Sequence, residues 1–161
     1  MAGLSSESPL RVGWGQLQSS GSSLSAVATY EFEVRGAIRT MVGVLQSKLF
    51  RHATMPVDND TNESKQAAYA IANPSEQAIT VQLILVDPDG TIIDDSVTET
   101  LGPGQQIAKY LWQALERKNF KGSLILHGQG EAPLAAVALI DKQGILTAIP
   151  LVEGKAPGGP Y

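Results

Sequence analysis

The sequence predicts an all-β fold, a β-sandwich of about nine or ten short strands with an internal duplication and one short amphipathic helix. Three observations support this prediction. Apolar and polar residues alternate along most of the chain, turn residues recur at short intervals, and the apolar period becomes helical only once. With 161 residues, 43% of them hydrophobic, the chain is long enough to bury a core as one domain.

The clearest strand signal lies between Leu24 and Val34, where even-numbered positions are apolar and odd-numbered positions are mostly polar. Such alternation places one face of a strand against a core and the other in water. Gly36 marks a turn, after which the chain is expected to return in a second strand over residues 37–46. The other predicted strands cover residues 49–57, 66–72, 78–86, 91–101, 120–127, 134–140 and 145–152.

One segment has a helical period. After the sequence GPG at residues 102–104, Ile107, Leu111 and Leu115 recur at intervals of four residues, with polar side chains on the opposite side. This spacing predicts one amphipathic helix over about residues 105–117.

Two parts of the chain resemble each other. Leu24–Ala28 and Leu134–Ala138 are identical at four of five positions, and a Gly-x-Leu segment precedes each, at residues 15–17 and 122–124. A hairpin turn and a further strand follow each one. The order of strand, loop, small-residue strand, hairpin and strand therefore occurs twice, which predicts an internal duplication. Chance identity is the alternative, because Ala and Val are common residues.

The domain organisation follows from the two ends of the chain. Residues 1–9 are polar and Ser-rich, without the basic and apolar regions of a signal peptide, and are expected to form a flexible arm. Residues 10–153 are expected to form a single β-sandwich domain. Residues 154–161 are rich in Gly and Pro and are expected to form a flexible tail.

The composition argues against several partners. The formal net charge is -4 and the Lys and Arg residues are scattered, whereas phosphate binding needs clustered cations, so no nucleic acid is expected. No apolar run approaches the roughly 18 residues of a membrane-spanning helix. The absence of cysteine excludes disulfides, thiol catalysis and zinc sites built on Cys.

Several segments combine turn residues with alanines of the expected core, at residues 55–59, 70–74, 101–108, 120–124 and 133–139, with Thr147 and Pro150. At these segments the chain resembles an uncharacterised Ig-like β-sandwich module that recurs in predicted secreted and cell-surface proteins of environmental bacteria. The resemblance covers about residues 13–152 and implies the fold and an extracellular or cell-surface location, with a cytoplasmic location left open. It implies no activity.

No catalytic motif is evident. The two histidines, His52 and His127, have no partners nearby in the sequence at the spacing of a metal or catalytic site, and are interpreted as ordinary surface or structural residues. No nucleophile elbow, P-loop or dinucleotide fingerprint occurs. The sequence therefore predicts no enzyme and no cofactor.

The polar segment at residues 58–65 is expected to be a loop and carries two weak site patterns. Asp58, Asp60 and Asn62 have the D-x-D-x-N spacing of calcium ligands, but an EF-hand would require Gly at position 63 and Glu at position 69. A solvated loop without metal is the preferred interpretation. Asn59 and Asn62 each begin an Asn-x-Ser/Thr sequence and are candidate glycosylation sites.

These observations favour a non-catalytic structural or surface module, which acts by self-association or within an extracellular assembly of the filament or surface-layer type. Its partners would be copies of itself or other surface proteins. The contact surfaces would be its sheet edges and its two arms. The alternative is a carbohydrate-binding or adhesion module, with or without calcium. In that case a glycan would stack on aromatic side chains, for which the candidates are Trp14, Tyr69, Tyr110 and Trp112.

Overall fold

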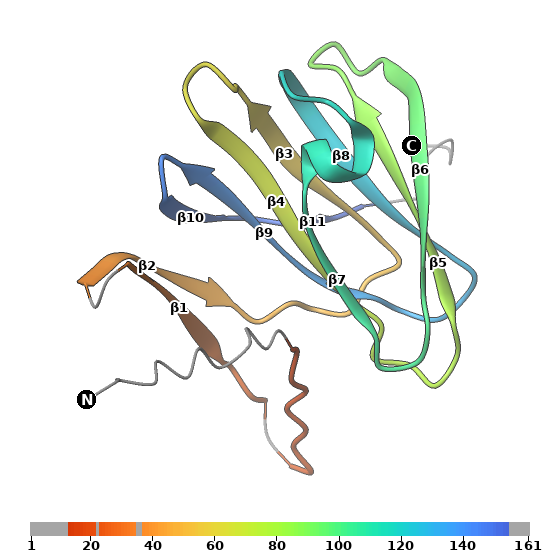
Figure 1. The fold of residues 1–161 in the computed structure, drawn as a ribbon. Helices are drawn as coiled ribbons and strands as arrows, with labels where there is room; N and C mark the ends of the chain where they lie inside the picture. The colour runs from red at the N-terminus through yellow and green to blue at the C-terminus, as the bar shows by residue number, and fades with distance from the viewer. Residues whose placement is uncertain (1–12, 22, 35–36, 155–161) are drawn as a thin grey trace, which may run out of the picture.

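The computed structural model describes residues 13–21, 23–34 and 37–154. Two antiparallel sheets face each other and form a sandwich, with one short helix at its side, so the predicted all-β fold is confirmed (Figure 1). The arm at residues 1–9, the turn at Gly36 and residues 155–161 of the predicted tail lie outside the described residues.

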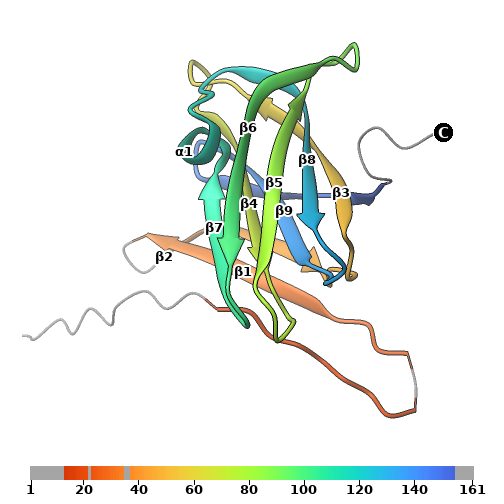
Figure 2. The same cartoon turned by 90° about the vertical axis from the view of Figure 1, so that its right-hand side faces the viewer.

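The sandwich has one sheet of four strands and one of five. In order across the smaller sheet lie β10 (Ile145–Ile149), β9 (Ala135–Lys142), β4 (Lys65–Ala72) and β7 (Gln106–Tyr110). In order across the larger sheet lie β11 (Val152–Glu153), β3 (His52–Asn59), β8 (Phe120–Gln129), β5 (Ile79–Val86) and β6 (Ile92–Leu101). A separate hairpin of β1 (Val27–Val34) and β2 (Ala37–Leu45) crosses the end of the sandwich (Figure 2).

The core lies between the two sheets and is built from alternate residues of their strands. On β8, Leu124 and Leu126 are fully buried while Ile125 and His127 face outward and are half-buried. Sequestering these apolar side chains from water is the main stabilising contribution to the fold. The largest fully buried apolar side chains are those of Met55, Ile71, Ile79, Val81, Leu83, Leu85, Leu101, Leu111, Leu124, Leu126 and Leu134.

The helix is shorter than the predicted 105–117. Only Leu111–Leu115 form the helix α1, and Gln106–Tyr110 form the edge strand β7, which pairs with β4. Local apolar spacing fits either structure here, because Ile107 packs on the core from a strand while Leu111 and Leu115 are buried from the helix. The open edge of β4 decides the outcome, since pairing satisfies its backbone hydrogen-bonding groups.

The described residues form eleven strands, and two of these were not predicted as separate strands. One is β7, and the other is β11, because the segment predicted as one strand over residues 145–152 is divided at Pro150. Proline has no N–H to donate to a strand partner. The chain crosses at this point from the four-stranded to the five-stranded sheet.

The two predicted repeats form similar hairpins in different surroundings. The β9–β10 hairpin belongs to the sandwich, with β9 also paired to β4, whereas β1 pairs only with β2 among the described strands. The strand expected around residues 15–17 is not formed. The described side chains of residues 13–21 are exposed, so no burial offsets the entropy lost in ordering a strand there.

Candidate functional site

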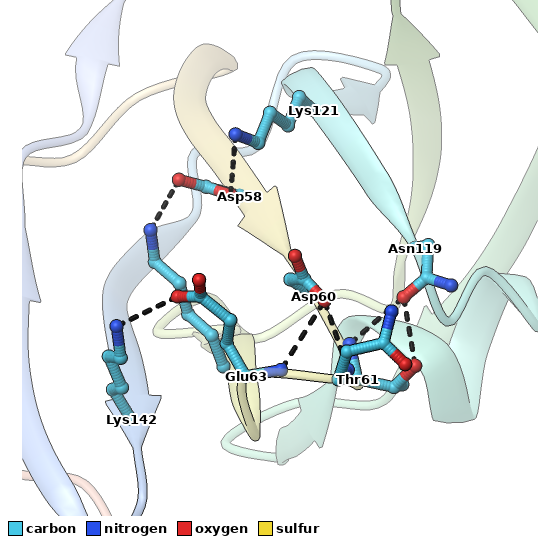
Figure 3. A network of polar contacts seen from close by, with 9 residues as sticks. Asp58, Asp60, Thr61, Glu63, Asn119, Lys121 and Lys142 are labelled. Carbon is cyan, nitrogen blue, oxygen red and sulfur yellow. Dashed lines mark hydrogen bonds and ion pairs between the residues drawn. The ribbon is translucent and has the colours of Figure 1, made fainter.

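The predicted loop over residues 58–65 is shorter in the structure, because β3 continues to Asn59 and β4 begins at Lys65. Of the calcium candidates, Asp58 therefore lies at the end of β3 and the others in the turn, and they contact lysines and backbone instead of converging (Figure 3). The Asp58 carboxylate bonds the Lys65 ammonium and lies 3.9 Å from Lys121 Nζ. The hydrogen bond from Lys65 lowers the pKa of Asp58, against the opposing effect of partial burial, and the charges of the nearby lysines lower it further. This carboxylate is already neutralised by the protein's own cations.

The other side chains of this turn are also engaged. Asp60 Oδ1 accepts hydrogen bonds from the backbone N–H groups of Asn62 at 2.9 Å and Glu63 at 3.4 Å. Glu63 Oε2 lies 2.8 Å from Lys142 Nζ on β9 (Figure 3). Within the described part of the chain, no three His, Asp or Glu side chains come together as a metal site would require. The arrangement stabilises the turn and does not favour calcium.

The two candidate glycosylation sites differ in accessibility. The Asn59 side chain is 2% exposed, its Nδ2 donates to the Arg117 carbonyl at 3.3 Å, and its Oδ1 accepts from the Ala67 N–H at 2.6 Å. The buried amide nitrogen of Asn59 leaves no room for a sugar in the folded protein, which disfavours glycosylation at this residue. Asn62 is exposed, and glycosylation there stays a prediction.

The four aromatic candidates do not form one platform for a sugar. Tyr69 is 2% exposed and belongs to the core. Trp14 Nε1 donates to the Gly104 carbonyl at 2.8 Å, at the start of β7, while Trp112 lies beyond the end of β7 and donates to Gln66 Oε1 at 3.1 Å. Tyr110 is half-buried and donates its hydroxyl to Asp141.

The Tyr69 hydroxyl is buried without a hydrogen-bond partner among the described residues, and burial raises its pKa well above the ordinary value. Replacing Tyr69 with phenylalanine removes this unsatisfied group and keeps the ring in the core. We expect Tyr69→Phe to leave the free energy of unfolding unchanged or raise it by about 1 kcal/mol. Urea unfolding measures the change, and a loss of more than about 1 kcal/mol would show that the hydroxyl is bonded in solution.

A pair of histidines that the sequence interpretation left apart lies on the outer face of the larger sheet. His52 on β3 is directly opposite His127 on β8. Their Nδ1 atoms are 2.7 Å apart, and the two ring planes are inclined at 20°. Burial lowers the pKa of His52, and the neighbouring charges of His127 and Arg51 lower it further. No spacing rule reveals this pair, because it depends on the register between two strands distant in sequence.

The β1–β2 hairpin presents apolar side chains on both of its faces. On the face toward the sandwich, Val42 and Val44 are 8% and 6% exposed, and Thr40 Oγ1 accepts a hydrogen bond from the N–H of Leu146 on β10 at 3.2 Å. Residues that alternate with these along the strands point the opposite way. We call the face that they form the outer face of the hairpin. Its apolar members are Val27, Met41 and Leu45, which are 62%, 56% and 71% exposed.

The base of the hairpin is held by Gln46. Its backbone N–H donates to the Ala26 carbonyl at 3.2 Å, its side-chain Oε1 accepts from the Ala26 N–H at 3.0 Å, and its Nε2 donates to the Leu24 carbonyl at 3.2 Å. One residue therefore extends the pairing of β1 and β2 beyond the strands. The outer face is consequently presented by an ordered hairpin that is fixed at its base.

Comparisons with known proteins add little to this description. No family model and no curated protein matches the sequence. The chain is similar to Thermotoga maritima 1070, a protein with a crystal structure, at 11% sequence identity and a TM-score of 0.43, over 66% of this chain and 97% of that chain. Among the described residues, no helix has the length and apolar character needed to cross a membrane.

Proposed function

We propose that the domain is a non-catalytic structural module that associates with copies of itself through the outer face of the β1–β2 hairpin. The observation that carries this proposal is the two-sided apolar character of the hairpin. On its inner face Val42 and Val44 of β2 are buried while Ala28 and Tyr30 of β1 are exposed. On its outer face Val27, Met41 and Leu45 are more than half exposed. A two-stranded hairpin is marginally stable in water by itself, and a second apolar layer would stabilise it.

The sheet edges of the sandwich are less suited to association than the hairpin. Glu99 of the edge strand β6 forms an ion pair with Lys109 of the edge strand β7, so these two edges are occupied by a contact with each other. The edge of β10 is approached by β2, whose Thr40 accepts from Leu146. The edge strand β11 has only two residues. We therefore propose that the hairpin, rather than a sheet edge of the sandwich, is the contact surface between copies.

The occupant we propose is the outer face of a second copy's hairpin. A two-fold axis would bring the same three apolar side chains from each copy together, as in most homodimers. Completing the burial of one such side chain contributes about 1 kcal/mol or more. The extracellular or cell-surface location implied by the resemblance, and the role as a subunit of a larger assembly, are parts of the same proposal.

Association is tested by a pair of variants with matched exposure. Met41 and Ile92 are both 56% exposed, but only Met41 lies on the hairpin. Met41→Lys is expected to weaken self-association by about tenfold or more, because the contact would then have to bury an ammonium group. A lysine opposite Glu31 is an acceptable cross-strand pair, so the hairpin is expected to form in this variant.

The measurement is sedimentation velocity, or size-exclusion chromatography with light scattering, over a wide range of protein concentration. The unmodified protein and Ile92→Lys are expected to associate alike, and Met41→Lys to remain monomeric at higher concentration. An unmodified protein that is strictly monomeric at high concentration contradicts the proposal. Equal weakening by both substitutions would place the contact elsewhere.

A further inference from the structure

The pairing of His52 and His127 is fixed by the backbone of the larger sheet. The Arg51 carbonyl accepts from the Gly128 N–H at 2.7 Å, while the His52 carbonyl points the other way and accepts from the Gly154 N–H at 2.9 Å. His52 and His127 therefore form a non-hydrogen-bonded pair of the antiparallel ladder, in which opposite side chains are closest. Two imidazoles are held together without any contribution from flexible loops.

The separation of the two nitrogens has a chemical consequence. At 2.7 Å the Nδ1 lone pairs cannot both face each other unoccupied, so a proton or a cation must lie between them. Two ligands bound at right angles, with metal–nitrogen bonds of about 2 Å, are separated by about 2.9 Å. The two rings are stacked, with centroids 4.5 Å apart, so they must rotate to direct both lone pairs at one ion, while their nitrogens already have nearly the spacing of two neighbouring coordination positions.

The surroundings of the pair are open to solvent on the side of His52. His52 lines an open hollow together with Arg51, Glu131 and Glu153, whereas His127 lies outside its lining. The Arg51 guanidinium is bound to Glu131 at 2.7 Å, so its charge is partly offset, and Glu153 adds a negative charge at the rim. Water would complete the coordination, since no third His, Asp or Glu joins the pair within the described residues.

We propose that His52 and His127 chelate a divalent transition-metal cation that prefers nitrogen ligands at right angles, which are the properties of Cu²⁺ and Ni²⁺. Zn²⁺ prefers tetrahedral ligands and would require the two nitrogens to move further apart. The site is independent of the proposed self-association, because it lies on β3 and β8 and not on the hairpin.

Titration calorimetry with Cu²⁺ and with Ni²⁺, on protein without a histidine tag, tests the chelate. The chain contains two histidines, so a chelate binds one ion per chain, whereas independent histidines would bind two. His52→Gln and His127→Gln are each expected to weaken binding by about 100-fold, as much as the double variant, because the second imidazole acts as an intramolecular ligand. Gln82→Ala, beside His127 on β5, is the matched control and is expected to bind normally.

Two results would overturn the proposal. One is binding that persists in the double variant, and the other is a stoichiometry of two ions that falls to one in each single variant. A measurement on the unmodified protein covers the case in which a variant does not fold. Substoichiometric Cu²⁺ is expected to broaden the imidazole NMR signals of both histidines together, and broadening of only one of them would refute the chelate.

Discussion

Replacing Gly122 with alanine is expected to lower the free energy of unfolding by about 3 kcal/mol or more. Gly122 lies in β8, between β3 and β5, with a φ of 154°. An added Cβ would lie 2.3 Å from the Val86 carbonyl oxygen and 2.7 Å from Phe120 Cζ. The phenylalanine ring can rotate away, but the carbonyl belongs to the neighbouring strand, so the central strands of the larger sheet would have to separate.

Urea unfolding followed by circular dichroism and tryptophan fluorescence measures this loss. Gly43→Ala is the matched control, because Gly43 is also a strand glycine and its added Cβ would meet only Val27 Cγ1, at 3.6 Å. The control is expected to change the unfolding free energy by less than about 1 kcal/mol. If Gly122→Ala unfolds at the same urea concentration as the control, the close approach of Val86 does not exist in solution.

Replacing Asn73 with alanine is expected to cost about 3 kcal/mol, the other large effect. The Asn73 side chain is fully buried at the turn after β4. Its Nδ2 lies 2.7 Å from the Gln77 carbonyl, 3.1 Å from that of Leu101 and 3.0 Å from that of Gly102, and its Oδ1 accepts from Ser75. One amide thus joins the turn after β4 to the end of β6, and alanine would leave several buried groups without partners.

Two further variants separate the donor from the acceptor half of this network. Asn73→Asp keeps the oxygen that accepts from Ser75 but loses the donors to the three carbonyls, so it is expected to be nearly as destabilising as alanine. Ser75→Ala removes only a peripheral hydroxyl and is expected to cost about 1 kcal/mol. Thermal and urea unfolding of the three proteins give the comparison. If the three variants Asn73→Ala, Asn73→Asp and Ser75→Ala have equal unfolding midpoints, the Asn73 amide is not an important link between the turn after β4 and the end of β6.

The strands were predictable because burial on one face imposes a period of two on the sequence. The segments predicted over residues 66–72 and 78–86 correspond closely to β4 and β5. The helix was overestimated because the spacing of Ile107, Leu111 and Leu115 satisfies a strand followed by a helix as well as one continuous helix. Only the neighbouring edge of β4 separates these possibilities, and an edge is a property of the assembled sheet.

The candidate sites were less predictable, for a related reason. The spacing of Asp58 and Asp60 could be recognised in the sequence. Lys121, which lies near Asp58, could not be placed there, because it belongs to β8, the strand adjacent to β3 in the sheet. The His52–His127 pair depends on the register of β3 with β8, and the open outer face of the hairpin depends on where β2 packs. Sequence patterns report what one element buries. They do not report which elements meet.

The attachment of the β1–β2 hairpin also bears on how the protein opens. The hairpin is joined to β3 by residues 46–51 and packs mainly on β10, whereas the sandwich closes over a continuous core. Amide protons of the hairpin can therefore exchange with solvent through a local opening that leaves the core intact, at a free energy below that of global unfolding. We therefore expect the hairpin and the sandwich to open as two cooperative units. Burial of the outer face in an assembly would slow amide exchange in the hairpin and bring it closer to the exchange rate of the sandwich.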